Sequence, residues 1–175
     1  MKLNEIYKKY EDKTDKGSGH SYIETYEEIM SPFINKEIVL LELGVSRGFS
    51  LLLWKEYLPN AIINGIDLKK IPGSILNKEN IFYFRMDCTN KEKIEKRFID
   101  NKFDIIIDDA SHRCSDQIAS FNIFYNNLNA GGIYVIEDVV IENVNALKSL
   151  SSNCEVRDFR KIKNRHDDIM IIYRK

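Results

Sequence analysis

The sequence predicts an α/β fold: a doubly wound, mostly parallel seven-stranded sheet with an antiparallel hairpin at its C-terminal end. Three observations predict it. Short apolar runs rich in β-branched residues alternate with longer runs of helical spacing. The last two apolar runs are separated by a polar connector alone. The 175 residues, 43% of them hydrophobic and 30% charged, suffice for one domain with a sizeable core.

Five apolar runs predict the parallel strands. Residues 38–43 (IVLLEL) are almost continuously apolar, which is typical of a strand covered by helices on both faces. The other four runs are residues 61–67, 81–87, 103–108 and 132–137. Their alternation with helical stretches predicts right-handed crossovers and a Rossmann-like arrangement.

Helices are predicted before and between these strands. Residues 3–10 and 22–30 indicate two helices ahead of the first strand, and Ser31 with Pro32 ends the second. Three apolar stripes follow: Phe49, Leu52, Leu53 and Tyr57; Ile94, Phe98 and Ile99; and Ile118, Phe121, Phe124, Tyr125 and Leu128. Residues 155–159 and 169–173 predict the hairpin. We therefore expect one domain over residues 1–175, with a helical cap at 1–35 and a Rossmann-like core at 36–175.

The composition excludes several classes of protein. A net charge of −1 creates no basic field that would attract nucleic acid. The three separate cysteines form no CxxC pair, which argues against a disulfide framework or a zinc site and indicates free thiols in a reducing compartment. The charged N-terminus has no apolar signal core, and no apolar run reaches the ~20 residues of a membrane helix. We expect a cytoplasmic protein without nucleic-acid or membrane partners.

Most predicted parallel strands end in acidic residues, and the first leads into a glycine turn. The features are Glu42 with the turn Gly44 to Gly48, then Asp67, Asp87, Asp108 with Asp109, and Glu137 with Asp138. Ligands bind beyond the carboxyl ends of the strands in open parallel sheets. Clustered carboxylates repel one another, so we expect a positive partner there, either a cationic cofactor or a metal ion.

The glycine turn favours S-adenosylmethionine (SAM) as the cofactor. Its pattern is E-x-G-x-x-x-G, so the G-x-G-x-x-G pyrophosphate fingerprint is absent. Gly44 and Gly48 allow the backbone to approach a ligand closely. Asp67, at the end of the next strand, is placed to accept hydrogen bonds from ribose hydroxyls, and Asp87 and Cys88 fall where an adenine edge would lie.

A metal site and a base are predicted at the later strand ends. Asp109, Glu137 and Asp138 are hard oxygen donors, which favour Mg²⁺ first, with Mn²⁺ or Ca²⁺ as alternatives. Glu137 and Asp138 can converge only if the strand ends beside them. His112 follows Asp109 by three residues, and an imidazole titrating near pH ~6.5 can act as a base at neutral pH. Together these groups point to O-methylation of a hydroxyl held on a cation.

These motifs resemble a known family. The segments TDKGSGHSYIETY, LLELGVSRGFS, DDASH and VIED are similar to the class I SAM-dependent, metal-dependent sugar O-methyltransferases of the mycinamicin and demethylmacrocin (macrocin) type. The similarity runs from Thr14 to about Asp138. It implies the class I methyltransferase fold, SAM and a divalent cation as cofactors, and a sugar-like acceptor.

The resemblance also assigns roles to residues. It implies that Asp109, Glu137 and Asp138 bind the metal, and that His112 is the catalytic base, working with Asp109. The N-terminal T-D-K segment, Thr14 to Lys16, is expected to fold over the cofactor. The full set of expected cofactor contacts is Lys16, Tyr22, Glu42, Gly44, Val45, Ser46, Gly48, Asp67, Leu68, Asp87 and Asp108.

Two departures from the family bear on the acceptor and the loop. Ala110 stands where the family has Gly in D-D-G-S-H, and Ala tolerates positive φ poorly. The chain also has little beyond the core fold with which to grip a macrolide. We therefore expect a smaller acceptor, such as a sugar, a nucleotide-linked sugar or a modest cell-surface precursor. The small core with few lid segments also favours a homodimer.

Three alternatives remain open at this point. The chain could be a metal-independent methyltransferase in which Asp109 and His112 act on a phosphate-type or carboxyl oxygen. It could be a nicotinamide-dependent oxidoreductase, against which the missing G-x-G-x-x-G counts. It could also be a non-catalytic SAM-binding module, against which the joint presence of three carboxylates and His112 argues.

Overall fold

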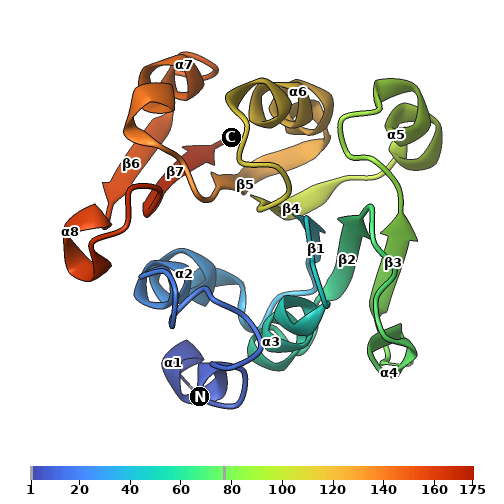
Figure 1. Cartoon of the computed structure of the whole chain (residues 1–175). Coiled ribbons are helices and arrows are strands. Elements are labelled where there is room, and N and C mark those ends of the chain that lie inside the picture. Colours follow the sequence, from blue (N-terminus) through green and yellow to red (C-terminus); the bar gives the residue numbers. More distant parts are fainter. Residues whose placement is uncertain (1, 77) are drawn as a thin grey trace.

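A computed structural model describes residues 2–76 and 78–175 and contains a seven-stranded sheet with helices on both faces (Figure 1). The strand order is β3-β2-β1-β4-β5-β7-β6. The strands are β1 (Val39–Leu43), β2 (Ile62–Asp67), β3 (Ile81–Arg85), β4 (Phe103–Asp108), β5 (Leu128–Ile136), β6 (Cys154–Asp158) and β7 (Ile169–Arg174). β1 to β5 are parallel, whereas β7 runs antiparallel to both β5 and β6. The predicted mixed sheet with its C-terminal hairpin is confirmed.

Helices α1 to α3 cover one face of the sheet, and α5 to α7 cover the other (Figure 1). The helices are α1 (Leu3–Tyr7), α2 (Ile23–Met30), α3 (Phe49–Tyr57), α4 (Gly73–Leu76), α5 (Lys91–Phe98), α6 (Cys114–Phe124), α7 (Val144–Lys148) and α8 (Arg160–Lys163). Three 3₁₀ turns lie at Ser31–Phe33, Tyr125–Asn127 and Ile141–Asn143. None of the helices in the described part of the chain has the length and apolarity that crossing a bilayer requires.

The central strands contribute side chains to two hydrophobic cores, one on each face of the sheet. In β1, Leu40 packs with the α1–α3 side and Leu41 with the α5–α7 side. In β4, Ile105 and Ile106 divide in the same way. Because successive side chains of a strand point to opposite faces, a strand that is covered on both faces favours apolar residues at nearly every position. The nearly continuous apolar runs of the sequence have this origin.

Several element bounds differ from the prediction. α1 ends at Tyr7 rather than residue 10, and β3 ends at Arg85, so Asp87 lies beyond the strand. β5 begins at Leu128, which the helical stripe had included. The polar connector of the hairpin contains α8, a short helix with an exposed, mostly basic surface. Its sequence therefore has little apolar periodicity from which a helix could be predicted.

Candidate functional site

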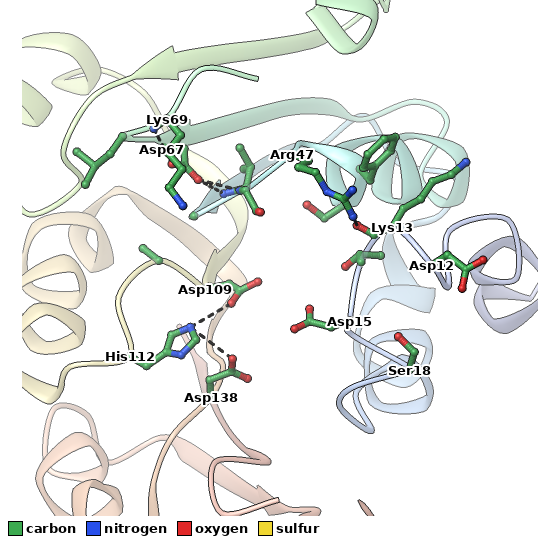
Figure 2. Close-up of a pocket in the computed structure, with 18 of the residues that line it drawn as sticks. Asp12, Lys13, Asp15, Ser18, Arg47, Asp67, Lys69, Asp109, His112 and Asp138 are labelled. Atoms are coloured by element: carbon green, nitrogen blue, oxygen red, sulfur yellow. Dashed lines mark hydrogen bonds and ion pairs between the residues drawn. The ribbon is translucent and has the colours of Figure 1, made fainter. Parts of the chain in front are cut away.

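A cavity of about 730 Å³ lies at the carboxyl ends of the parallel strands (Figure 2). Its lining comes from the turn after β1, the ends of β2, β4 and β5, and the N-terminal segment of residues 11–18. A second cavity of about 310 Å³ adjoins it and is lined by Asp87 and Cys88. Gly44, Asp67, Leu68 and Ala110 line both cavities. The acids Asp67, Asp87, Asp109 and Asp138 therefore lie around two adjoining cavities.

The turn after β1 is shaped by Gly44. Its φ is +79°, and a Cβ atom there would lie 2.1 Å from the Asp109 carbonyl oxygen and 2.4 Å from Ala110 Cα. A glycine is needed because the loops after β1 and β4 touch at this point. Gly48, also at φ +79°, precedes the first residue of α3.

Asp67 holds the same turn in place. Its Oδ2 accepts hydrogen bonds from the backbone N–H groups of Val45 at 3.0 Å and Ser46 at 2.8 Å. Its Oδ1 accepts one from the N–H of Lys69 at 2.8 Å. A carboxylate offers about four lone pairs, so Asp67 retains acceptor capacity for a ligand's hydroxyls.

Asp109, His112 and Asp138 converge in the larger cavity (Figure 2). One ligand atom from each lies within 4.8 Å of the other two. His112 Nε2 lies 3.6 Å from Asp109 Oδ1 and 3.4 Å from Asp138 Oδ2. The contact with Asp109, reinforced by the negative charge of Asp138, raises the pKa of His112 even though burial opposes the charged form.

The backbone at the end of β5 allows Asp138 to join this group. β5 ends at Ile136, and Asp138 adopts a left-handed conformation with φ +54°. Aspartate enters this region more readily than most residues, although at an energetic cost. The expected end of the strand beside Asp138 is thus observed.

Glu137 points to a different partner. Its carboxylate accepts a hydrogen bond from Lys16 Nζ at 2.7 Å and another from the hydroxyl of Tyr26. Lys16 also lies 2.8 Å from Asp109 Oδ2 and 3.3 Å from Glu42 Oε1. Burial alone would lower the pKa of Lys16, but the surrounding carboxylates raise it well above its ordinary value. Burial raises the pKa of both Glu42 and Glu137.

The predicted cofactor contacts fall into two groups. Gly44, Val45, Ser46, Asp67, Leu68 and Asp87 line the cavities. Lys16, Tyr22, Glu42, Gly48 and Asp108 are not among the lining residues in the described part of the chain. The four side chains of this second group are buried. Asp108, for example, accepts a hydrogen bond from Tyr134, and its burial raises its pKa to about 7.

Ala110 is not strained. Within residues 2–76 and 78–175, the non-glycine residues with positive φ are Ser46, Asn80, Asp138 and Asn164. The loop therefore does not require a left-handed residue at this position, and the replacement of Gly by Ala is a small change.

Other residues around the site escaped the sequence prediction. Lys13, Arg47 and Lys69 add basic groups to the cavity wall. Across the cavity from Asp109, His112 and Asp138 lie Asp15, which belongs to the expected T-D-K segment, and Ser18 (Figure 2). The T-D-K motif was the available signal for this segment, but a motif does not reveal which of its side chains face a ligand.

Relatives with assigned activities support a methyltransferase site. The demethylmacrocin O-methyltransferase of Streptomyces fradiae is 30% identical over 146 residues, which are 78% of this chain and 36% of that protein. The mycinamicin VI 2''-O-methyltransferase of Micromonospora griseorubida is 29% identical over 133 residues, or 69% of this chain and 32% of that protein. No family model matches the chain.

A solved structure confirms the fold. A MycE methyltransferase from the mycinamycin biosynthetic pathway, in complex with Mg and SAH, superposes with a TM-score of 0.82 at 23% identity. The alignment covers 100% of this chain and 55% of that one. The chain spans about a third of the length of these two curated relatives. The chain therefore has the class I methyltransferase fold, and its resemblance to sugar O-methyltransferases is confirmed.

Proposed function

We propose that this chain is a SAM-dependent O-methyltransferase that methylates a hydroxyl of a sugar or another small metabolite with the help of a divalent cation. The observation that carries the proposal is the convergence of Asp109, His112 and Asp138 in one cavity with the Gly44 turn and Asp67. The sugar O-methyltransferases among its relatives support the same class of reaction.

The cofactor is assigned to the two adjoining cavities. The smaller cavity, with Asp87 and Cys88, would take the adenine. Asp67 lines both cavities and would accept hydrogen bonds from the ribose hydroxyls. The turn beside Gly44 would hold the amino-acid end.

The donor set fits a hard divalent cation. Asp109 and Asp138 supply carboxylate oxygens close enough to share one ion, and Mg²⁺ prefers such ligands. Glu137 would become a third ligand only by turning away from Lys16. A bound cation would supply Lewis acidity that makes the acceptor hydroxyl easier to deprotonate.

His112 is the proposed general base. Its imidazole would take the hydroxyl proton as the methyl group passes from SAM to the acceptor oxygen, which would leave S-adenosylhomocysteine. In the structure the ring Nε2 lies 3.6 Å from Asp109, so this nitrogen would turn from the carboxylate to accept the proton. The negative charges of Asp109 and Asp138 favour the protonated form of the ring. A bound cation would neutralise these charges, so the neutral ring, which can accept a proton, would then be favoured. The ring is about half exposed, which lets the proton pass on to solvent.

The remaining finer assignments are part of this proposal. Residues 1–35 would act as a cap over residues 36–175 within one domain. The acceptor would be a sugar or a sugar-linked small molecule, the class of substrate that the names of the relatives describe. A cytoplasmic location, the lack of a nucleic-acid partner and a possible homodimer stay predictions.

Calorimetric titration and a methyl-transfer assay test the function. SAM should bind, and S-adenosylhomocysteine should be released in the presence of small glycosides with free hydroxyls and Mg²⁺. A chelator should stop turnover. Undiminished turnover with a chelator would favour the metal-independent alternative, and SAM binding without any turnover would favour the non-catalytic module. Failure to bind SAM, together with binding of a nicotinamide dinucleotide, would refute the proposal.

A further inference from the structure

Asp138 is clamped by the hydroxyl group of Tyr22. The hydroxyl donates to Asp138 Oδ1 at 2.8 Å and accepts a hydrogen bond from the backbone N–H of the same residue at 3.3 Å. Tyr22 has no exposed surface. One group thus holds both the side chain and the backbone of a residue whose φ is +54°.

His20 supports the clamp from a second direction. Its ring stacks on that of Tyr22 with centroids 4.8 Å apart. Its Nδ1 lies 3.2 Å from Asp138 Oδ1 and 3.2 Å from Asp168 Oδ1. Because Tyr22 and His20 both approach Oδ1, the other carboxylate oxygen, Oδ2, is left to face His112 and the cavity.

The hairpin connector anchors this arrangement. Asp168 is fully buried and also lies 3.3 Å from the backbone N–H of Ser21, which donates to it. Lys163 Nζ donates to the backbone carbonyls of Gly17, Ser18 and His20. The segment that carries His20 and Tyr22 is therefore tied to the C-terminal part of the chain.

We propose that Tyr22 and His20 are positioning residues that preset Asp138 for a divalent cation, an inference that rests on the proposed function. Without the clamp, the left-handed backbone at Asp138 can relax toward ordinary conformations and the carboxylate loses its fixed direction. Groups that orient metal ligands typically change metal affinity by about 10- to 100-fold when they are removed. Tyr22, predicted from sequence as a cofactor contact, would act through Asp138 instead.

The test is the affinity of the whole chain for Mn²⁺, measured by calorimetry or electron paramagnetic resonance. Tyr22→Phe keeps the ring and removes the hydroxyl, so it should weaken Mn²⁺ binding by about 10- to 100-fold. SAM affinity should stay near that of the unmodified chain. Tyr173→Phe is the matched control, because it removes a buried hydroxyl that donates to the Leu147 carbonyl at 2.8 Å, away from the site.

His20 gives a second pair of variants that remains informative if Tyr22→Phe does not fold. The amide nitrogen of Asn can replace a donor at Nδ1, so His20→Asn should retain most of the Mn²⁺ affinity. His20→Ala should lose it, and so should His20→Leu, which has about the shape of Asn but no donor. Retention in His20→Asn together with loss in His20→Leu would support positioning, because these two side chains differ in the donor and hardly in shape.

Two results would overturn the inference. One is unchanged Mn²⁺ affinity in folded Tyr22→Phe and His20→Ala. The other is an equal loss in Tyr173→Phe, which would indicate general destabilisation. Asp138→Asn separates this inference from the function on which it rests: if it loses Mn²⁺ while Tyr22→Phe does not, only the positioning role fails. If it binds Mn²⁺ normally, the proposed cation site fails and the inference fails with it.

Discussion

The ammonium group of Lys16 lies 2.7 Å from a carboxylate oxygen of Glu137, and both side chains are almost completely buried. Two more carboxylates, those of Glu42 and Asp109, lie within 3.3 Å of the same ammonium. Carboxylates at the ends of β1, β4 and β5 thus share the buried ammonium group of Lys16. This lysine neutralises part of the negative edge of the sheet and ties the N-terminal segment to it.

Replacing Lys16 by Met should therefore destabilise the protein strongly. Breaking a buried ion pair leaves uncompensated charge and costs about 3–5 kcal/mol. Urea denaturation at neutral pH measures the change. Lys9→Met is the control, because Lys9 pairs with Glu56 at an exposed position, and such pairs contribute at most about 1 kcal/mol. Equal effects of the two substitutions would contradict the role given to Lys16.

Substituting Gly44 should damage the site more than substituting another glycine of similar conformation. In Gly44→Ala the new methyl group would meet the backbone of Asp109 at 2.1 Å, so the loops after β1 and β4 must separate. Gly131 has φ +78° but nothing within 4 Å of its added Cβ, so Gly131→Ala should cost only about 1–2 kcal/mol of backbone strain. Calorimetry should show SAM binding lost in the first variant and kept in the second. Normal SAM binding by Gly44→Ala would contradict the proposed cofactor turn.

Substituting His112 distinguishes a base from a metal ligand. Its Nε2 lies close enough to both aspartates for either role. If His112 is the base, His112→Ala should lower kcat by about 10²- to 10⁴-fold while Mn²⁺ affinity changes little. Steady-state kinetics and Mn²⁺ titration of the same preparation measure both quantities. A parallel loss of Mn²⁺ affinity would assign His112 to the metal instead.

Cys88 should alkylate slowly at about pH 8, because burial raises the pKa of its thiol to about 12 and the reactive form is the thiolate. Below the pKa, the thiolate fraction and the rate should rise about tenfold per pH unit. Mass spectrometry after iodoacetamide treatment can compare it with Cys114 and Cys154, which are less buried. Because Cys88 lines the smaller cavity, bound SAM should slow the reaction further. Reaction as fast as at Cys114 would contradict the burial of this thiol.

The sheet and its acidic edge were predictable because both leave local patterns in the sequence. The run 38–43 is apolar because β1 is covered on both faces, and that pattern needs no knowledge of distant residues. The positions of Asp67 and Asp109 at strand ends follow from the same runs. Parallel strands then bring these ends to one edge.

The partners of individual side chains were not predictable in this way. Lys16 belongs to a residue type that is almost always exposed, and its burial depends on carboxylates that are 26 to 121 residues away in sequence. Glu137 and Asp138 share a motif, yet one binds Lys16 and the other faces His112. The strand has ended beside them, and Asp138 itself has a left-handed backbone. Tyr22 lies in the expected segment, but only the packed structure shows that its hydroxyl meets Asp138.

The account holds that a divalent cation and the SAM methyl group meet in one cavity. Nuclear magnetic resonance of SAM labelled with ¹³C at the methyl carbon, bound to the chain and titrated with Mn²⁺, tests this directly. Strong paramagnetic broadening of the methyl signal is predicted, and it should vanish when Asp109 and Asp138 are both replaced by Asn. A methyl signal that stays sharp in the bound cofactor at saturating Mn²⁺ would contradict the claim.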